Sequence, residues 1–184
     1  MTLNKASFLL LFVVMNIQLS AQIYMTRNGL VSFTSEAPLE IIKASSSELS
    51  GAINLDDNKF AFIVSNQSLK GFNSALQQEH FYENYMEIEK YPSSTFEGKI
   101  IEKLDPASKE VQHIRAKGIL TIHGVGAERI IRADVKFDGN KIIVTSNFTV
   151  SLEDHKIHIP KIVYQKIAEI INVDIQAELA PKTK

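Results

Sequence analysis

Regular alternation of apolar and polar residues is the feature that most limits how this chain can fold. Over residues 114–122, every even-numbered position is apolar or glycine, whereas Arg115, Lys117 and Thr121 occupy odd-numbered positions. Because successive side chains of a strand point to opposite faces, this period of two predicts a half-buried antiparallel strand. Similar or shorter stretches predict further strands over residues 30–34, 39–44, 51–55, 59–69, 96–103, 131–137, 142–152 and 172–179.

Short connections and two helical segments complete the expected architecture. Asp138-Gly139 separates two alternating stretches, and tight hairpin turns favour such a glycine because they require positive φ angles. Apolar residues at helical spacing predict short helices over residues 73–87 and, beginning at Pro160, over residues 160–171. The chain is therefore expected to be all-β and mainly antiparallel, with eight or nine strands forming a barrel or a sandwich.

The N-terminal segment has the pattern of a secretory signal peptide. Lys5 precedes an apolar run over residues 8–15, and Ala21 supplies the small residue expected before a cleavage site at Gln22. The run is too short to cross a hydrocarbon core of ~30 Å comfortably, although an uncleaved anchor is the alternative. We therefore expect residues 1–21 to be a signal peptide and residues 22–184 to form a single exported domain.

The composition excludes several classes of site. The chain has no cysteine, which rules out thiol catalysis, thiolate metal ligands and a lipid anchor on an N-terminal cysteine. Its formal net charge is −1, and Lys and Arg are scattered among Asp and Glu, so there is no electrostatic footprint for nucleic acid. No phosphate loop, dinucleotide fingerprint or Gly-x-Ser-x-Gly motif occurs, and we expect no cofactor.

Three short motifs carry a resemblance to a known family. They are Gln-Glu-His-Phe at residues 78–81, Tyr-Pro at 91–92 followed by Phe96, and Gly-Ile-Leu-Thr-Ile-His-Gly-Val at 118–125. In this order the chain resembles the YceI-like family over about residues 29–179. The resemblance implies a lipocalin-like antiparallel barrel, periplasmic or secreted, that binds a polyisoprenoid or another lipid-like molecule and has no established catalytic activity.

The chain departs from the family pattern at two places. An Arg-Asp pair is common shortly before the histidine of the first motif, but Gln77 and Gln78 occupy these positions. A histidine near the first strand is also replaced, since residues 30–33 read Leu-Val-Ser-Phe. These departures concern the contacts with a ligand's head group.

Small residues on the predicted inner face indicate a cavity. Ala116, Gly118, Ala133 and Ser146 lie on three successive strands, and an eight-stranded barrel is just wide enough either to be filled or to hold one small ligand. The alternative is that large neighbours fill these gaps, since barrels often alternate small and large residues. We expect these residues to contact an apolar ligand: Phe60, Phe62, Leu76, Phe81, Ala116, Gly118, Leu120, Ala133, Phe137 and Phe148.

The histidines do not form a recognisable catalytic or metal site. His80 follows Glu79 but lacks the second histidine of a His-Glu-x-x-His zinc motif, and His123 precedes a glycine-rich turn. His155 and His158 would face opposite sides of a strand, so a shared metal ion is not expected. The expected function is binding of an apolar ligand, without catalysis. The alternatives are a small exported hydrolase or isomerase that uses His80 or His123, and an interaction module with a solid core.

Overall fold

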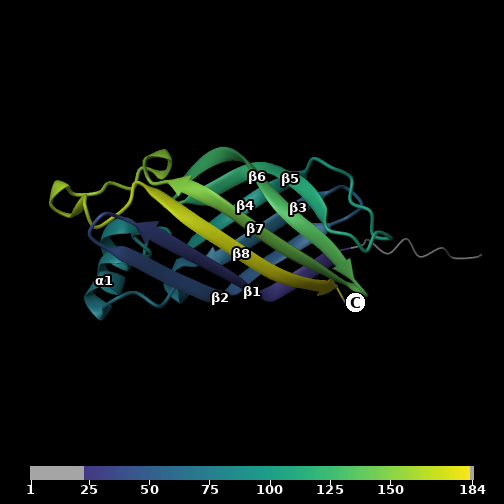
Figure 1. The fold of residues 1–184 in the computed structure, drawn as a ribbon, viewed down its shortest axis with the longest axis horizontal. Helices are drawn as coiled ribbons and strands as arrows, with labels where there is room; N and C mark the ends of the chain where they lie inside the picture. Colours follow the sequence, from purple (N-terminus) through teal and green to yellow (C-terminus); the bar gives the residue numbers. More distant parts are fainter. Residues whose placement is uncertain (1–22, 183–184) are drawn as a thin grey trace, which may run out of the picture.

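The alternating segments form eight strands that close into one antiparallel barrel (Figure 1). A computed structural model describes residues 23–182 of the chain, so the predicted signal peptide lies outside the described residues. Each strand pairs with its neighbours in sequence, and the last strand pairs with the first. The strands are β1 (Ile23–Glu36), β2 (Ile41–Asn54), β3 (Lys59–Ser65), β4 (Ser93–Ile100), β5 (Gln112–Ile122), β6 (Val125–Asp138), β7 (Lys141–Ser151) and β8 (Ile170–Pro181). The helical elements are η1 (Asn66–Ser68), α1 (Ala75–His80), η2 (Phe81–Tyr85), η3 (Glu153–His155) and η4 (Lys161–Val163).

The barrel has eight strands and not nine, because two of the predicted strands are parts of a single strand. Residues 39–44 and 51–55 belong largely to β2, which runs through the polar stretch between them. Ser46 lies in that stretch, is buried, and exchanges a side-chain hydrogen bond of 2.6 Å with Ser68. A buried hydroxyl that has a partner costs little, so the strand continues where the apolar pattern stops.

The hairpin and the first helix agree with the sequence. Gly139 has φ +59° between β6 and β7, as the predicted tight turn requires. The predicted helix over residues 73–87 is shorter and has two parts, α1 followed by the π-helical turn η2. The side chain of Ser74 caps α1 by accepting a hydrogen bond of 3.1 Å from the backbone N–H of Gln77.

The second predicted helix, over residues 160–171, is wrong. Only the short turn η4 forms there, and β8 already begins at Ile170. Two bonds, one to the β1–β2 connection and one to the end of β1, hold the segment in another shape: Leu39 N–H donates to the carbonyl of Gln165 (2.9 Å), and Ala168 N–H donates to Ser35 Oγ (2.9 Å). Helical spacing was present, but tertiary hydrogen bonds outweighed it.

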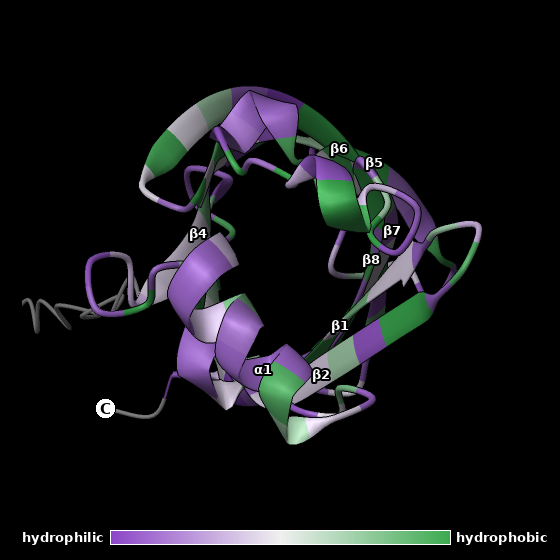
Figure 2. Cartoon of the chain, turned by 90° about the vertical axis from the view of Figure 1, so that its left-hand side faces the viewer, coloured by the Kyte–Doolittle hydropathy of each residue, from purple (hydrophilic) through white to green (hydrophobic). Residues whose placement is uncertain are grey.

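The two ends of the barrel differ. One end carries α1 and the connection between β7 and β8, and Figure 2 looks along the barrel from that side. The opposite end carries the β4–β5 connection and the β6–β7 hairpin, and it is packed solid. Ile142 and Leu179 are fully buried there. The buried core residues that do not line the cavity described below form this solid core: Leu104, Phe137, Ile142, Ala177 and Leu179.

Candidate functional site

The barrel encloses a cavity of about 500 Å³ that extends to the residues of α1. This volume lies within the range of ~300–1,000 Å³ that is usual for small-molecule sites. All eight strands contribute inward-facing side chains to its wall, and α1, η2 and the residues around η4 line its mouth. Most of the lining side chains are apolar, so the cavity suits an apolar guest.

Small side chains on three neighbouring strands account for the empty space. Ala116 on β5, Ala133 on β6 and Ser146 on β7 line the cavity, where larger residues would have filled it. Ala133 and Phe148 face inward and are nevertheless only half-buried, because the interior beside them is open. The hollow half therefore follows from side-chain size, whereas the closed wall follows from the strand pairing.

Eight of the ten predicted ligand residues line this cavity, and their contact with a ligand stays a prediction. They come from the wall and from the mouth, and α1 and η2 bring two of them over the opening. The eight are Phe60, Phe62, Leu76, Phe81, Ala116, Leu120, Ala133 and Phe148.

Gly118 and Phe137 are not among the cavity-lining residues. Gly118 lies opposite Gly98, and a Cβ atom on Gly118 would overlap the backbone carbonyl oxygen of Glu97. Its missing side chain therefore permits close approach of β4 and β5, and the expectation that it leaves space for a ligand is wrong. Phe137 faces inward but belongs to the solid end, where its ring packs edge-on against Tyr24 at a centroid distance of 6.5 Å.

An aromatic cluster that the sequence did not predict lies at the mouth. Phe33 of β1, Phe72 of the connection before α1, and Phe81 of η2 lie together, with ring centroids 4.9–6.0 Å apart. All three line the cavity, and they attach the α1–η2 segment to the barrel. Alternation could have indicated Phe33, but no local pattern marks Phe72, which lies outside any strand or helix.

Polar groups gather at the mouth on the α1 side. Gln77 Nε2 donates to Glu40 Oε1 (3.0 Å), and Asn73 Nδ2 donates to the carbonyl of Ile41 (2.9 Å). Glu40, Gln77, His80 and Lys166 all line the opening. Gln77 is one of the two positions where the family's Arg-Asp pair is replaced, and it lines the cavity, whereas Gln78 does not.

His123 lies in the β5–β6 turn and contacts neighbouring parts of the chain. It has φ +52° in the β5–β6 turn, its Nε2 lies 2.9 Å from Glu87 Oε2, and its Nδ1 lies 3.3 Å from the carbonyl of His155. Hydrogen bonds from Lys90 and then from His123 lower the pKa of Glu87 below its usual value. His123 does not line the cavity, whereas His80 lines its mouth from α1.

A second histidine, His155, lies next to His123. His155 is fully buried, and its Nδ1 lies 2.9 Å from the carbonyl of Val125 at the start of β6. Within residues 23–182, no group of three or more histidines and carboxylates could hold a metal ion. In the same part of the chain, no helix has the length and apolar character needed to cross a membrane.

The model of the YceI-like domain matches residues 26–179. The chain belongs to the YceI-like family. Its barrel resembles a polyisoprenoid-binding domain from Saccharophagus degradans implicated in plant cell wall breakdown, with TM-score 0.74, 14% identity, and coverage of 89% of this chain and 100% of that chain. Burkholderia cenocepacia BcnA has TM-score 0.67 and 13% identity, covering 83% of this chain and 96% of that chain.

A third structural neighbour of this YceI-like chain is the YceI protein of Campylobacter jejuni. It has TM-score 0.57 and 20% identity, and the match covers 74% of this chain and 81% of that chain. At these identities the neighbours establish the lipocalin-like barrel fold that the motifs implied. None of the curated proteins compared with the YceI-like chain matches it.

Proposed function

We propose that this YceI-like protein is an exported binding protein that holds an apolar lipid, most simply a polyisoprenoid, inside its barrel. The observation that carries the proposal is the cavity of about 500 Å³, which is open beside α1 and closed at the other end by a solid core. A chain-shaped apolar guest would enter tail first, with its head group at the polar mouth.

The driving force would be burial of the guest's hydrocarbon chain. Each Å² of apolar surface removed from water contributes about 25 cal/mol, before the costs of association are subtracted. The polar groups near Glu40, Gln77 and His80 would then orient the head group and contribute little affinity. The polyisoprenoid assignment is supported by family membership and by the polyisoprenoid-binding neighbour from Saccharophagus degradans. Export is supported by the N-terminal signal pattern and by the family.

Mass spectrometry of organic extracts from natively purified protein tests the proposal. The expected result is a stoichiometric apolar lipid that disappears when the protein is denatured before purification. Protein that carries no apolar molecule, and that takes up none of a series of polyprenols, would contradict it.

A histidine variant separates binding from catalysis. His80→Ala combined with His123→Ala should retain the extracted lipid, because neither imidazole belongs to the apolar wall formed by the strands. A reaction of the bound lipid that stops in this variant would instead favour the hydrolase or isomerase.

A further inference from the structure

Apolar side chains are exposed on one side of the cavity mouth. Leu39 and Ile41 belong to the β1–β2 connection and the start of β2, and Ile162 and Tyr164 belong to the connection between β7 and β8. Their exposed fractions are 66% for Leu39, 56% for Ile41, 91% for Ile162 and 63% for Tyr164. We call these four residues the apolar rim. Exposed apolar groups gathered at one place often mark an interaction site.

The two parts of the apolar rim are held side by side. The backbone N–H of Leu39 donates to the carbonyl of Gln165 at 2.9 Å, directly after Tyr164. Ala168 N–H donates to Ser35 Oγ at 2.9 Å and fixes the same loop to the end of β1. The rim is therefore one continuous surface that the barrel presents in a defined orientation.

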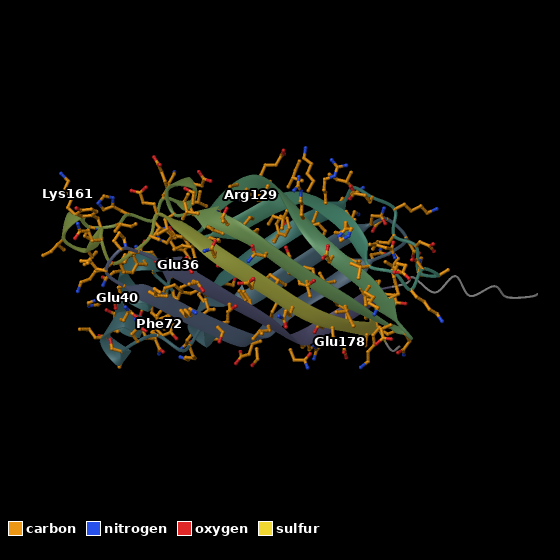
Figure 3. The ribbon with its side chains drawn as sticks, in the orientation of Figure 1. Glu36, Glu40, Phe72, Arg129, Lys161 and Glu178 are labelled. Atoms are coloured by element: carbon orange, nitrogen blue, oxygen red, sulfur yellow. The ribbon has the colours of Figure 1, made fainter. Side chains whose placement is uncertain are left out.

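The middle of the loop that carries half of the rim is basic, and the acidic residues Glu153, Asp154 and Glu169 lie at its two ends. Residues 156–166 include Lys156, Lys161 and Lys166 but no Asp or Glu, although the whole chain has a net charge of −1. None of these three lysines forms an ion pair with the described residues. Figure 3 shows Lys161 extending beyond the barrel end, with Glu36 and Glu40 set back from it.

The same loop has an inner face that belongs to the cavity. Val163 and Ile167 line the cavity, whereas Ile162 and Tyr164, on either side of Val163, are directed to the outside. The apolar rim therefore continues directly into the mouth of the cavity. A surface that touched the rim would also lie at the cavity opening.

We propose that the apolar rim and the lysines of residues 156–166 dock the protein on an anionic lipid bilayer. Isoleucine, leucine and tyrosine side chains bury in the boundary between head groups and acyl chains, and tyrosine is enriched at that depth in membrane proteins. Lysines next to them are attracted to anionic head groups. The combination of exposed apolar residues and unpaired lysines fits a lipid surface better than a protein partner, whose interface core would be depleted of charge. Docking does not require that the cavity be filled.

The absence of tryptophan from the chain permits a direct test. Tyr164→Trp places a single fluorophore on the rim, and Val111→Trp places one at a half-exposed position in the β4–β5 connection, at the opposite end of the barrel. Each full-length gene is expressed, and the protein that the cells release into the soluble fraction is mixed with vesicles of phosphatidylcholine and phosphatidylglycerol. We expect a blue shift of Tyr164→Trp emission and quenching by brominated acyl chains, with neither effect for Val111→Trp. Equal responses of the two variants, or no response of Tyr164→Trp, would overturn the proposal.

Charge is tested by vesicle co-sedimentation with matched lysine variants. Lys161→Gln should lower the partition coefficient on anionic vesicles about fivefold, since each interfacial lysine contributes about that factor. Lys109→Gln, in the β4–β5 connection, should leave it unchanged. Wild-type binding should also weaken as salt is raised and when phosphatidylglycerol is omitted. Equal effects of the two lysine variants would contradict docking through this loop.

Two further measurements distinguish membrane docking from a failure of the cavity and from self-association of the chain. Uptake of the apolar dye N-phenyl-1-naphthylamine should be the same for Lys161→Gln and wild type, so a loss of docking is not mistaken for a failure of the cavity. Light scattering without vesicles tests a second copy of the chain as the occupant of the rim. Concentration-dependent dimers that Ile162→Asp abolishes would assign the rim to self-association and overturn the membrane proposal.

Discussion

Gly98 and Gly118 face each other across β4 and β5, and their missing side chains let the two backbones approach closely. The Cα of Gly98 would lie 3.1 Å from a Cβ on Gly118, and the carbonyl oxygen of Glu97 would lie closer still. A contact of this kind involves backbone on both sides, so no rotamer change can relieve it. A glycine at an inward-facing position therefore does not by itself provide space for a ligand, because the neighbouring strand can occupy that space.

We predict that Gly118→Ala destabilises the protein although it adds only one methyl group. The added Cβ forces β4 away from β5, and overpacking of this kind costs about 1–3 kcal/mol. Gly126→Ala is the control, because its Cβ would meet the side-chain methyl of Ile119 at 3.0 Å and no backbone atom. Urea unfolding should show a clearly larger loss for Gly118→Ala. Equal stability of the two variants would mean that the strands move apart without cost.

The contacts of Glu87 lead to a second prediction at the scale of one residue, which concerns how stability depends on pH. Its carboxylate is bound by Lys90 and by His123, and these bonds hold its pKa below the usual 4.5. A carboxyl whose pKa is lower in the folded state stabilises the fold above its unfolded pKa. This stabilisation is lost as the pH falls through the folded value.

We expect Glu87→Gln to be less stable than wild type near neutral pH, and the difference to shrink as the pH falls below about 4.5. Glu89→Gln is a suitable control, because Glu89 is exposed and has no ion pair among the described residues. Chemical unfolding at several pH values measures both variants. A difference between Glu87→Gln and wild type that does not change with pH would show that the ionised carboxylate is not what matters.

The elements at the mouth differ from the strands because they depend on side-chain packing. The segment of α1 and η2 is attached through the aromatic cluster and through Tyr82, whose hydroxyl lies 2.8 Å from the carbonyl of Leu69. A helix of this length is not stable by itself in water. The position of α1 over the cavity therefore depends on Phe81 and its neighbours.

We predict that Phe81→Ala loosens the α1–η2 segment and lowers stability by about 2 kcal/mol, below the ~3–5 kcal/mol for a fully buried phenylalanine because Phe81 is only half-buried. Leu76→Ala, on the same segment but 59% exposed, should cost much less. Hydrogen exchange should become faster in residues 75–85 for Phe81→Ala only. Unchanged exchange in this segment would mean that other contacts hold it.

Alternation was enough to predict most strands, the β6–β7 hairpin and the antiparallel class, because the period of two is set by the strand itself. It left a barrel and a sandwich open, and the closed barrel was predicted from the family resemblance. Alternation split β2 at Ser46, where a hydroxyl partner replaced apolar burial, and it could not foresee that bonds to Ser35 and Leu39 would prevent a helix after Pro160. For the site, the pattern specified which face of a strand points inward but not how far along the barrel a residue lies. The pattern therefore could not show that Ala133 lines the cavity, whereas Phe137 belongs to the solid core.

At the scale of the whole molecule, the barrel divides into a solid half and a hollow half. The solid half, with Ile142 and Leu179 fully buried, supplies the packed core that a chain without disulfides requires. The hollow half leaves apolar side chains such as Phe148 only half-buried and forgoes part of that stabilisation. Binding of an apolar ligand would restore the missing contacts, so the lipid-bound protein should be more stable than the lipid-free form.

Two alanines on inward faces distinguish the two halves experimentally. Ala133 lines the cavity and is half-buried, whereas Ala177 is 4% exposed within the solid core. Ala133→Phe should fill open space, so the lipid-free variant should melt near the wild-type temperature but retain much less apolar lipid through purification. Ala177→Phe should overpack the core and lose about 1–3 kcal/mol, which corresponds to a fall of several degrees in melting temperature for a domain of this size. Calorimetry of lipid-free protein and mass spectrometry of extracted lipid measure the two effects separately. Similar destabilisation by both variants would show that the interior beside Ala133 is packed in solution, and an undiminished lipid content in Ala133→Phe would place the ligand elsewhere.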